Sequence, residues 1–186
     1  YLFGVALAAD AEFPPAISLA RVKGARTIGF FRESGENDIF FNGVRQGTLN
    51  GAADNKMEVI LDVTVPFTSA LTEESINNMK QIITILKEYK PDFVVGAVLE
   101  DGCHSFIKAM QAMNYTPSAV LLSECLSNVM GYKEVVGDAG RYVTGSTLWD
   151  HRLTGRIFNE DGSSLLHYFP AAVCQHIDVL YLIQKY

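Results

Sequence analysis

The sequence has few cysteines, no long apolar run and no excess of basic residues, and each shortage excludes a class of protein. Three cysteines in 186 residues fit neither a dense disulfide framework nor the spacing of a zinc site. Because no apolar run approaches membrane-spanning length, we expect no direct membrane insertion by this segment. The formal net charge of −6 argues against nucleic acid as a partner.

What the chain does contain is enough apolar sequence for one globular core. Hydrophobic residues make up 48% of it, and the length suits one domain and part of another. The chain opens on Tyr1, without a starting Met and inside a strand-like run. We therefore expect a fragment or a processed product.

The stretch from Lys90 to Gly102 organises the rest of the chain. Phe93–Val98 is a β-branched apolar run between a proline and an acidic turn, which predicts a strand buried on both faces. Apolar residues recur at helical spacing before it (74–89) and after it (102–113). This pattern predicts a βαβ unit at the centre of a parallel sheet, with a candidate ligand site at its carboxyl end, 99–102.

The same signals predict the other elements. Thr72, followed by two acidic residues, is a good helix start, and Asp38 is expected to cap another helix. Further strands are predicted at Thr27–Phe31, Met57–Val65, Ser118–Leu122 and Tyr142–Gly145, and a strand or hinge segment at Leu2–Leu7. Helices are predicted at Pro14–Lys23, Asp38–Ala52 and Pro170–Tyr186. Irregular structure is expected at Trp149–His167, with a turn at Asn159–Gly162.

Three glycines lie four residues apart on the predicted helix that starts near Asp38. Glycine costs a helix roughly 1 kcal/mol relative to Ala, so Gly43, Gly47 and Gly51 need a compensating role. We expect them to let the helix backbone approach the sheet closely. A phosphate-binding loop is the disfavoured alternative, because such loops place their glycines in the turn before the helix.

The order and spacing of these elements resemble those of the type I periplasmic-binding-protein family. This family includes bacterial branched-chain amino-acid-binding proteins and the extracellular ligand-binding regions of eukaryotic receptors. The likeness covers about residues 1–145, and the final helix also fits. It is carried by Gly24–Gly29, the Gly43-x-x-x-Gly47 helix, Lys90–Val94, Phe106–Lys108 and a strand that ends in Ser123-Glu124.

The resemblance implies an α/β fold in which a Rossmann-like parallel sheet is flanked by helices. This would be one lobe of a two-lobed protein that closes on its ligand. Residues 1–12 would then be a hinge or crossover segment, residues 13–145 the lobe, and residues 146–186 a crossover and a helix that returns toward the other lobe. The resemblance also implies an extracytoplasmic location, in a periplasm or on the outer side of a membrane receptor.

Three loops would face the ligand: 32–37, 99–104 and 123–128. In amino-acid-binding members of the family, an acidic residue of the third loop pairs with the ligand's ammonium group, and Glu124 stands at the matching position. A solvated loop acid or a helix cap is the alternative for Glu124. Those members also place an aromatic side chain near the start of the second loop, where this sequence has none. We predict ligand-binding roles for Glu124, Ser34, Glu100, Leu99 and Ser123.

Two cysteines and a histidine near these loops have other interpretations. Cys103 and Cys125 follow neighbouring strands, and a disulfide would suit an extracytoplasmic domain. Cys103 also fits the apolar stripe of its helix, which is the interpretation we favour. Asp101, Cys103 and His104 point in different directions from a helix start, which argues against a metal site. With no nucleophile elbow or acid–base pair, the sequence predicts no enzyme activity, no cofactor and no metal.

Three functions remain as hypotheses. The first is a module that binds a small molecule, an amino acid or similar, as a transport receptor or a receptor ectodomain. The second is a lobe without such a ligand that serves for dimerisation or assembly; its partner would be a second copy of the chain, in a homodimer. The third is a flavodoxin-like or Rossmann enzyme domain, but its phosphate loop would fall at 32–36, which is too acidic. The acidic loops favour a cationic or zwitterionic ligand.

Overall fold

Short apolar runs rich in β-branched residues form one sheet, because such strands can be buried on both faces. The computed structural model describes residues 8–35, 37–125, 129–141, 143–145, 157–158 and 164–165. In chain order its elements are η1 (Ala9–Ala11), α1 (Pro14–Val22), β1 (Thr27–Ser34), α2 (Asp38–Asp54), β2 (Glu58–Pro66), α3 (Glu73–Tyr89), β3 (Phe93–Ala97), α4 (Glu100–Ala112), β4 (Val120–Leu122), α5 (Val129–Val136), η2 (Gly137–Gly140), β5 (Val143–Gly145), β6 (Ile157–Phe158) and β7 (Ser164–Leu165).

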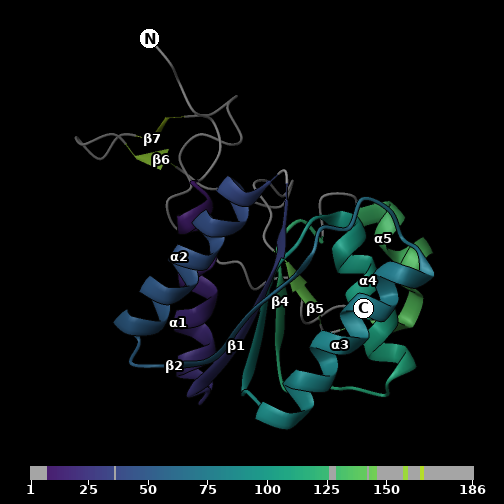
Figure 1. Ribbon diagram of the computed structural model, residues 1–186. Coiled ribbons are helices and arrows are strands. Elements are labelled where there is room, and N and C mark those ends of the chain that lie inside the picture. Colours follow the sequence, from purple (N-terminus) through teal and green to yellow (C-terminus); the bar gives the residue numbers. More distant parts are fainter. Residues whose placement is uncertain are drawn as a thin grey trace.

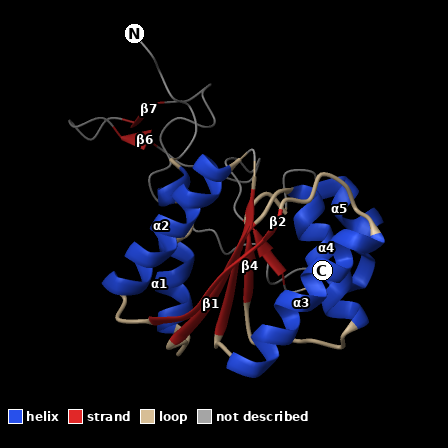
Figure 2. Cartoon of the chain, viewed as in Figure 1, coloured by secondary structure: helices blue, strands red, loops and turns tan. Residues whose placement is uncertain are grey.

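Five of these strands make a parallel sheet in the order β2-β1-β3-β4-β5. Strand β3 is buried along its whole length and lies in the middle, which confirms the predicted central strand. Helices α1 and α2 cover one face of the sheet, and α3, α4 and α5 cover the other (Figure 1). Figure 2 shows the same three layers by secondary structure. The predicted α/β fold with a parallel sheet flanked by helices is therefore confirmed.

Each face of the sheet has its own apolar core. Phe30 and Phe41 belong to the cluster under α1 and α2, whereas Phe31 and Phe106 belong to the cluster under α3 and α4. The rings of Phe31 and Phe106 stack with their centroids 4.6 Å apart. Because neighbouring residues of a strand point to opposite faces, β1 contributes to both cores.

Helix ends follow the sequence signals, with one correction. Thr72 caps α3 as predicted: its hydroxyl accepts the Ser75 N–H at 3.1 Å, and the Ser75 side chain accepts the Thr72 N–H at 2.9 Å. Gly24, with φ of 106°, follows the end of α1. Asp38, however, is the first residue of α2 and not its cap. Its carboxylate accepts the Gly35 N–H at 3.2 Å, and so it orders the turn before the helix.

Two segments differ from the sequence analysis, and three predicted segments cannot be compared. Two short antiparallel strands, β6 and β7, occur inside the stretch predicted to be irregular. No element was predicted where α5 and η2 lie, because α5 spans only eight residues and contains Gly131. The predicted segment at 2–7, the turn at 159–162 and the helix at 170–186 lie outside the described residues.

The amino ends of β1 and β3 are joined by one carboxylate. Asp92 precedes β3, and its Oδ2 accepts the Arg26 N–H at 2.8 Å and the Thr27 N–H and hydroxyl at 3.0 Å. The Asp92 N–H in turn donates to the Thr27 hydroxyl at 3.0 Å. The two backbone N–H groups are the chief cause that lowers the pKa of Asp92. This contact sets the register of the two central strands.

The glycines of α2 face a different neighbour from the one predicted. Gly43, Gly47 and Gly51 bring α2 close to η1 and α1, not to the sheet. A β-carbon on Gly47 would overlap the backbone carbonyl of Asp10, and one on Gly51 would lie 3.1 Å from the Pro14 Cα. The predicted close approach of the helix backbone is present, but its partner is the segment made of η1 and α1.

Replacing Gly47 with Ala gives a test in which the sign of the change in stability is informative. In an unobstructed helix this change stabilises by roughly 1 kcal/mol. Here the new methyl group would overlap the backbone of Asp10, so we expect Gly47→Ala to lower the free energy of unfolding by about 1–3 kcal/mol. Chemical denaturation measures it, with the exposed α2 residue Asn42 changed to Ala as the control. A stabilised Gly47→Ala protein would contradict the packing.

Candidate functional site

The carboxyl ends of all five parallel strands lie at one edge of the sheet, which we call the carboxyl edge. The three predicted ligand loops follow β1, β3 and β4, and these strands are neighbours in the sheet. The strand order reverses between β1 and β3, and open α/β sheets bind ligands at such a switch point. The structure thus brings together the described parts of the three loops; residues 36 and 126–128 lie outside them.

A buried carboxylate holds this edge together. Glu33 was predicted to lie in a polar loop, but it belongs to β1 and its side chain is fully buried. Its Oε1 accepts the Thr68 N–H and its Oε2 accepts the Leu99 N–H, each at 3.0 Å. Thr68 belongs to the β2–α3 loop and Leu99 to the β3–α4 loop, so a single side chain connects both loops to β1.

The surroundings of Glu33 enclose its carboxyl group and shift its pKa. Gly102, in the first turn of α4, lies so close that a β-carbon there would be 2.7 Å from the Glu33 Cδ and would overlap Oε1. Burial raises the pKa of Glu33; the hydrogen bonds from Leu99 and Thr68 act in the opposite direction, and the negative charge of Asp101 adds to the rise.

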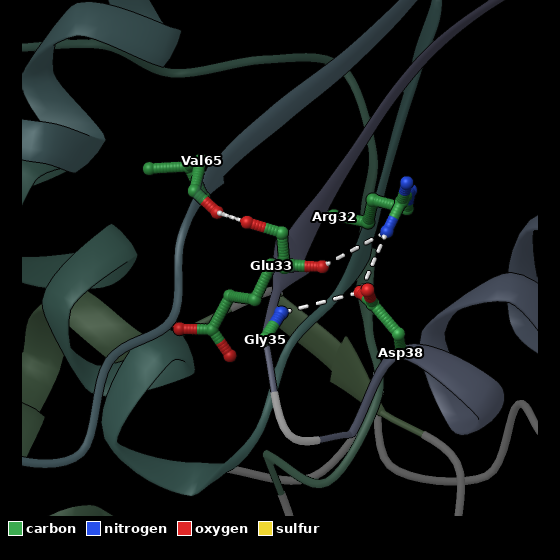
Figure 3. Close-up of polar contacts among 6 residues, drawn as sticks. Arg32, Glu33, Gly35, Asp38 and Val65 are labelled. Atoms are coloured by element: carbon green, nitrogen blue, oxygen red, sulfur yellow. Dashed lines mark hydrogen bonds and ion pairs between the residues drawn. The ribbon is translucent and has the colours of Figure 1, made fainter.

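On the other side of Glu33, the end of β1 forms a separate polar cluster. The Arg32 guanidinium lies 3.2 Å from the Asp38 carboxylate, and the Ser34 hydroxyl donates to the Val65 carbonyl at 3.4 Å. Figure 3 shows the Glu33 carboxylate pointing away from the Arg32–Asp38 pair. The predicted ligand residue Ser34 thus lies at the carboxyl edge, with its hydroxyl directed to β2.

The segment that follows β4 is joined by one link to the β3–α4 loop and by another to α4. The Ser123 hydroxyl accepts the Val98 N–H at 2.8 Å and donates to the Val98 carbonyl at 2.6 Å. A disulfide joins Cys103 to Cys125, with the two Cα atoms 5.4 Å apart. This corrects our preference for a purely apolar role of Cys103, since the residue is both in the core and bonded. Strands β3 and β4 are adjacent, which brings the two cysteines together.

The remaining predicted residues occupy distinct positions. Leu99 is the N-cap residue of α4 and Glu100 its first residue; both are half-buried. Ser123 is fully buried between the two strands. Glu124 is half-buried and has φ of 49°, a left-handed conformation that non-glycine residues adopt at a cost. Its neighbours Ser123 and Cys125 are both fixed, which holds Glu124 in this conformation.

His104 lies behind this edge and serves in packing. Its ring is buried, 6.0 Å from the ring of Tyr132 on α5, and Nε2 has no hydrogen-bond partner among the described residues. Burial lowers the pKa of His104, although the charges of Glu100 and Asp101 oppose that shift. Within the described part of the chain, no group of three or more metal-ligating side chains could hold a metal ion, and no helix combines the length and apolar character needed to cross a bilayer.

Glu33 is the residue that the sequence analysis missed, although the sequence contains a signal for it. Residues two apart in a strand share a face, and Phe31 is a core residue. Extending that alternation places Glu33 inside. Gly102 is the second signal, because a glycine in the first turn of a helix indicates that something approaches its backbone. Neither signal names the partner, since Thr68 and Leu99 are 35 and 66 residues away along the chain.

Comparisons with known proteins bear on the fold. No protein-family model matches the chain, and no curated sequence gives a significant match. Solved structures do match with probability 1.00, and they include solute-binding and substrate-binding proteins of ABC transporters. The chain has the fold of one lobe of a type I periplasmic-binding protein, as the resemblance implied.

Three of these structures illustrate the likeness. A leucine-, isoleucine-, valine-, threonine- and alanine-binding protein from Brucella ovis has a TM-score of 0.67 and 12% identity over 82% of this chain and 37% of its own. A solute-binding protein from R. palustris in complex with benzoate has a TM-score of 0.62 and 17% identity over 82% of this chain and 39% of its own. A fatty-acid substrate-binding protein from Thermomonospora curvata has a TM-score of 0.58 and 13% identity over 78% of this chain and 36% of its own. The chain therefore spans less than two fifths of the length of each.

The disulfide gives a first prediction for this edge. It closes a loop of 22 residues, which the chain-entropy model values at about 3 kcal/mol. We expect Cys125→Ala to lower the free energy of unfolding by about that amount, as measured by denaturation under non-reducing conditions. Reductant should destabilise the unaltered protein in the same way and leave the variant unchanged. A variant that reductant destabilises further would contradict the assignment.

The second prediction concerns pH. Because the folded-state pKa of Glu33 is raised above the ordinary 4.5, the folded protein keeps a proton that the unfolded chain has lost. The stability that this proton contributes is complete below pH 4.5 and disappears as the pH rises through the folded pKa. The stability of the natural protein should therefore fall relative to that of Glu33→Gln as pH increases from 4.5 to 7. Denaturation of both proteins across this range measures the difference, and a pH-independent difference would contradict it.

Proposed function

We propose that this chain is one lobe of an extracytoplasmic ligand-binding module that traps a small molecule between two lobes. The observation that carries the proposal is the carboxyl edge: loops from three neighbouring strands converge at a switch point, on a fold shared with solute-binding proteins. Such a module would serve either in transport or as the ectodomain of a receptor, and we propose a binding role for it without catalysis of its own.

The Cys103–Cys125 disulfide supports the extracytoplasmic location. Disulfides persist in oxidising compartments and are rare in the reducing cytosol. This one lies in the core behind the proposed ligand loops, joining α4 to the residue after Glu124. It therefore supports the proposed function as well as the location, because it fixes the backbone that presents Glu124.

For the ligand we propose an amino acid or a similar small molecule whose cationic group pairs with Glu124. The left-handed backbone at Glu124 is a strained conformation, and strain of this kind collects at functional sites. Leu99, Glu100 and Ser34 lie at the same edge and would shape the rest of this lobe's contact surface. Ser123 would act indirectly, because its hydroxyl is already bonded to Val98.

The assembly hypothesis has no observation in its favour among the described residues. The large apolar side chains exposed there lie on α1, on α2, in the loop before α3 and at the end of α3. Single exposed apolar residues are normal on a monomer surface. These residues are Val22, Ile39, Leu71 and Tyr89.

A thermal-shift screen of the full-length protein tests the proposed function. Free amino acids, amides and other small metabolites form the panel. A ligand that binds only the folded state stabilises it by about 2.7 kcal/mol at a hundredfold excess over its Kd, and so raises the Tm. We expect a hit that Glu124→Gln abolishes.

The matched control is Glu58→Gln, the same change at an exposed residue at the opposite edge of the sheet. This control should retain the hit. If the ligand still raises the Tm of Glu124→Gln, Glu124 is not part of the site, but the proposal of a ligand-binding module stands. A folded, self-associating protein without any hit would favour assembly instead.

A further inference from the structure

The N-terminus of α4 lies at the switch point between β1 and β3. In open α/β sheets this is where ligands bind, and the N–H groups at a helix N-terminus attract anions. Here the position is taken by the chain itself. The Glu33 carboxylate reaches it from β1 and accepts the N–H of the N-cap residue Leu99 at 3.0 Å.

The position is built around a carboxylate group. Leucine at the N-cap has no side-chain acceptor, and α4 has no side-chain cap of its own. Glu33, from another strand, supplies an acceptor for the N–H of Leu99 itself, while its second oxygen accepts the Thr68 N–H at 3.0 Å. Gly102 provides the room, since a β-carbon there would lie 2.7 Å from the Glu33 Cδ and 2.8 Å from Oε2.

We propose that the N–H groups of Thr68 and Leu99, together with Gly102, form a carboxylate-binding site that the chain fills with its own Glu33. Glu33 is then a positioning residue: it fixes the β2–α3 and β3–α4 loops relative to β1. It also determines specificity, because it occupies the donors that an anionic ligand group would need. This second consequence rests on the proposed function, whereas the first does not.

The charges around the site bear on the second consequence, the choice of ligand. Asp101 and Glu100 lie in the same turn of α4, and the negative charge of Asp101 acts on Glu33. The start of α4 therefore carries two acidic residues of its own, and the N–H of its N-cap residue is taken by the buried Glu33. A ligand group that faces this lobe is consequently selected for positive or neutral character.

Chemical rescue of Glu33→Ala tests the proposal in the full-length protein. Acetate has the heavy atoms that this substitution removes. We expect Glu33→Ala to lower the Tm, and sodium acetate to restore at least half of the loss in a saturable way. Sodium chloride at equal ionic strength should not restore it. If Glu33→Ala does not fold in chloride, the measurement becomes the yield of refolded protein, which should be higher in acetate.

The matched control is Glu33→Gln, which fills the same space without the charge. Acetate should shift the Tm of Glu33→Gln no more than that of the natural protein, because the amide blocks the site. An equal response of all three proteins to acetate, or equal refolding yields in acetate and chloride, would overturn the proposal.

Gly102→Ala provides an independent measurement. In the natural protein the added methyl group meets the Glu33 carboxylate, so the Tm should fall. In the Glu33→Ala background that obstacle is absent, and the same change should leave the Tm unchanged or raise it, because Ala favours a helix over Gly. An equal loss in both backgrounds would show that Gly102 does not serve the carboxylate.

The consequence for specificity is tested separately with benzoate and acetate as anionic probes. The natural protein should show no Tm shift beyond that of the chloride control. A saturable stabilisation of the natural protein by either anion would overturn the exclusion of anions. A ligand panel without hits would contradict the proposed function, whereas rescue of Glu33→Ala by acetate would still establish the carboxylate site.

Discussion

The arrangement of the carboxyl edge depends on one buried carboxyl group. A carboxylate removed from water is costly unless hydrogen-bond donors replace the lost solvent. Glu33 finds its donors in Thr68 and Leu99, which belong to two different loops. The two hydrogen bonds of one side chain therefore fix the spacing of β1, the β2–α3 loop and the β3–α4 loop. These segments are distant in sequence and meet at the edge of the sheet where the ligand site is proposed.

The central pair of strands is held by a carboxylate at each end. Asp92 connects β3 to the start of β1, and Glu33 connects the end of β1 to the loop after β3. The former is exposed and its hydrogen bonds lower its pKa, whereas the latter is buried and its pKa is raised. Ser123 and the Cys103–Cys125 disulfide extend the same rigidity to β4. The proposed ligand residue Glu124 is thereby presented on fixed backbone at the edge of a rigid sheet.

Much of the fold could be predicted from local sequence. The apolar run at Phe93 gave the central strand, and Thr72 gave the start of α3, because both signals act within a few residues. The errors have a common cause. The glycines of α2 indicate close approach but not the partner, and Cys103 satisfies an apolar stripe as well as a disulfide. A residue's chemistry shows what it can do, while its partner is set by the fold.

The sequence by itself determined the class of fold, the central strand and the strand ends at which a site would lie, since periodicity and turn residues are local properties. Tertiary structure alone decided that Glu33 meets the N–H groups of Thr68 and Leu99, that α2 packs on η1, and that Cys103 meets Cys125. Each of these contacts joins residues brought together by strand order, and strand order is a property of the folded sheet. The physical reason is that burial and pairing of a charge or a thiol depend on neighbours that no local pattern specifies.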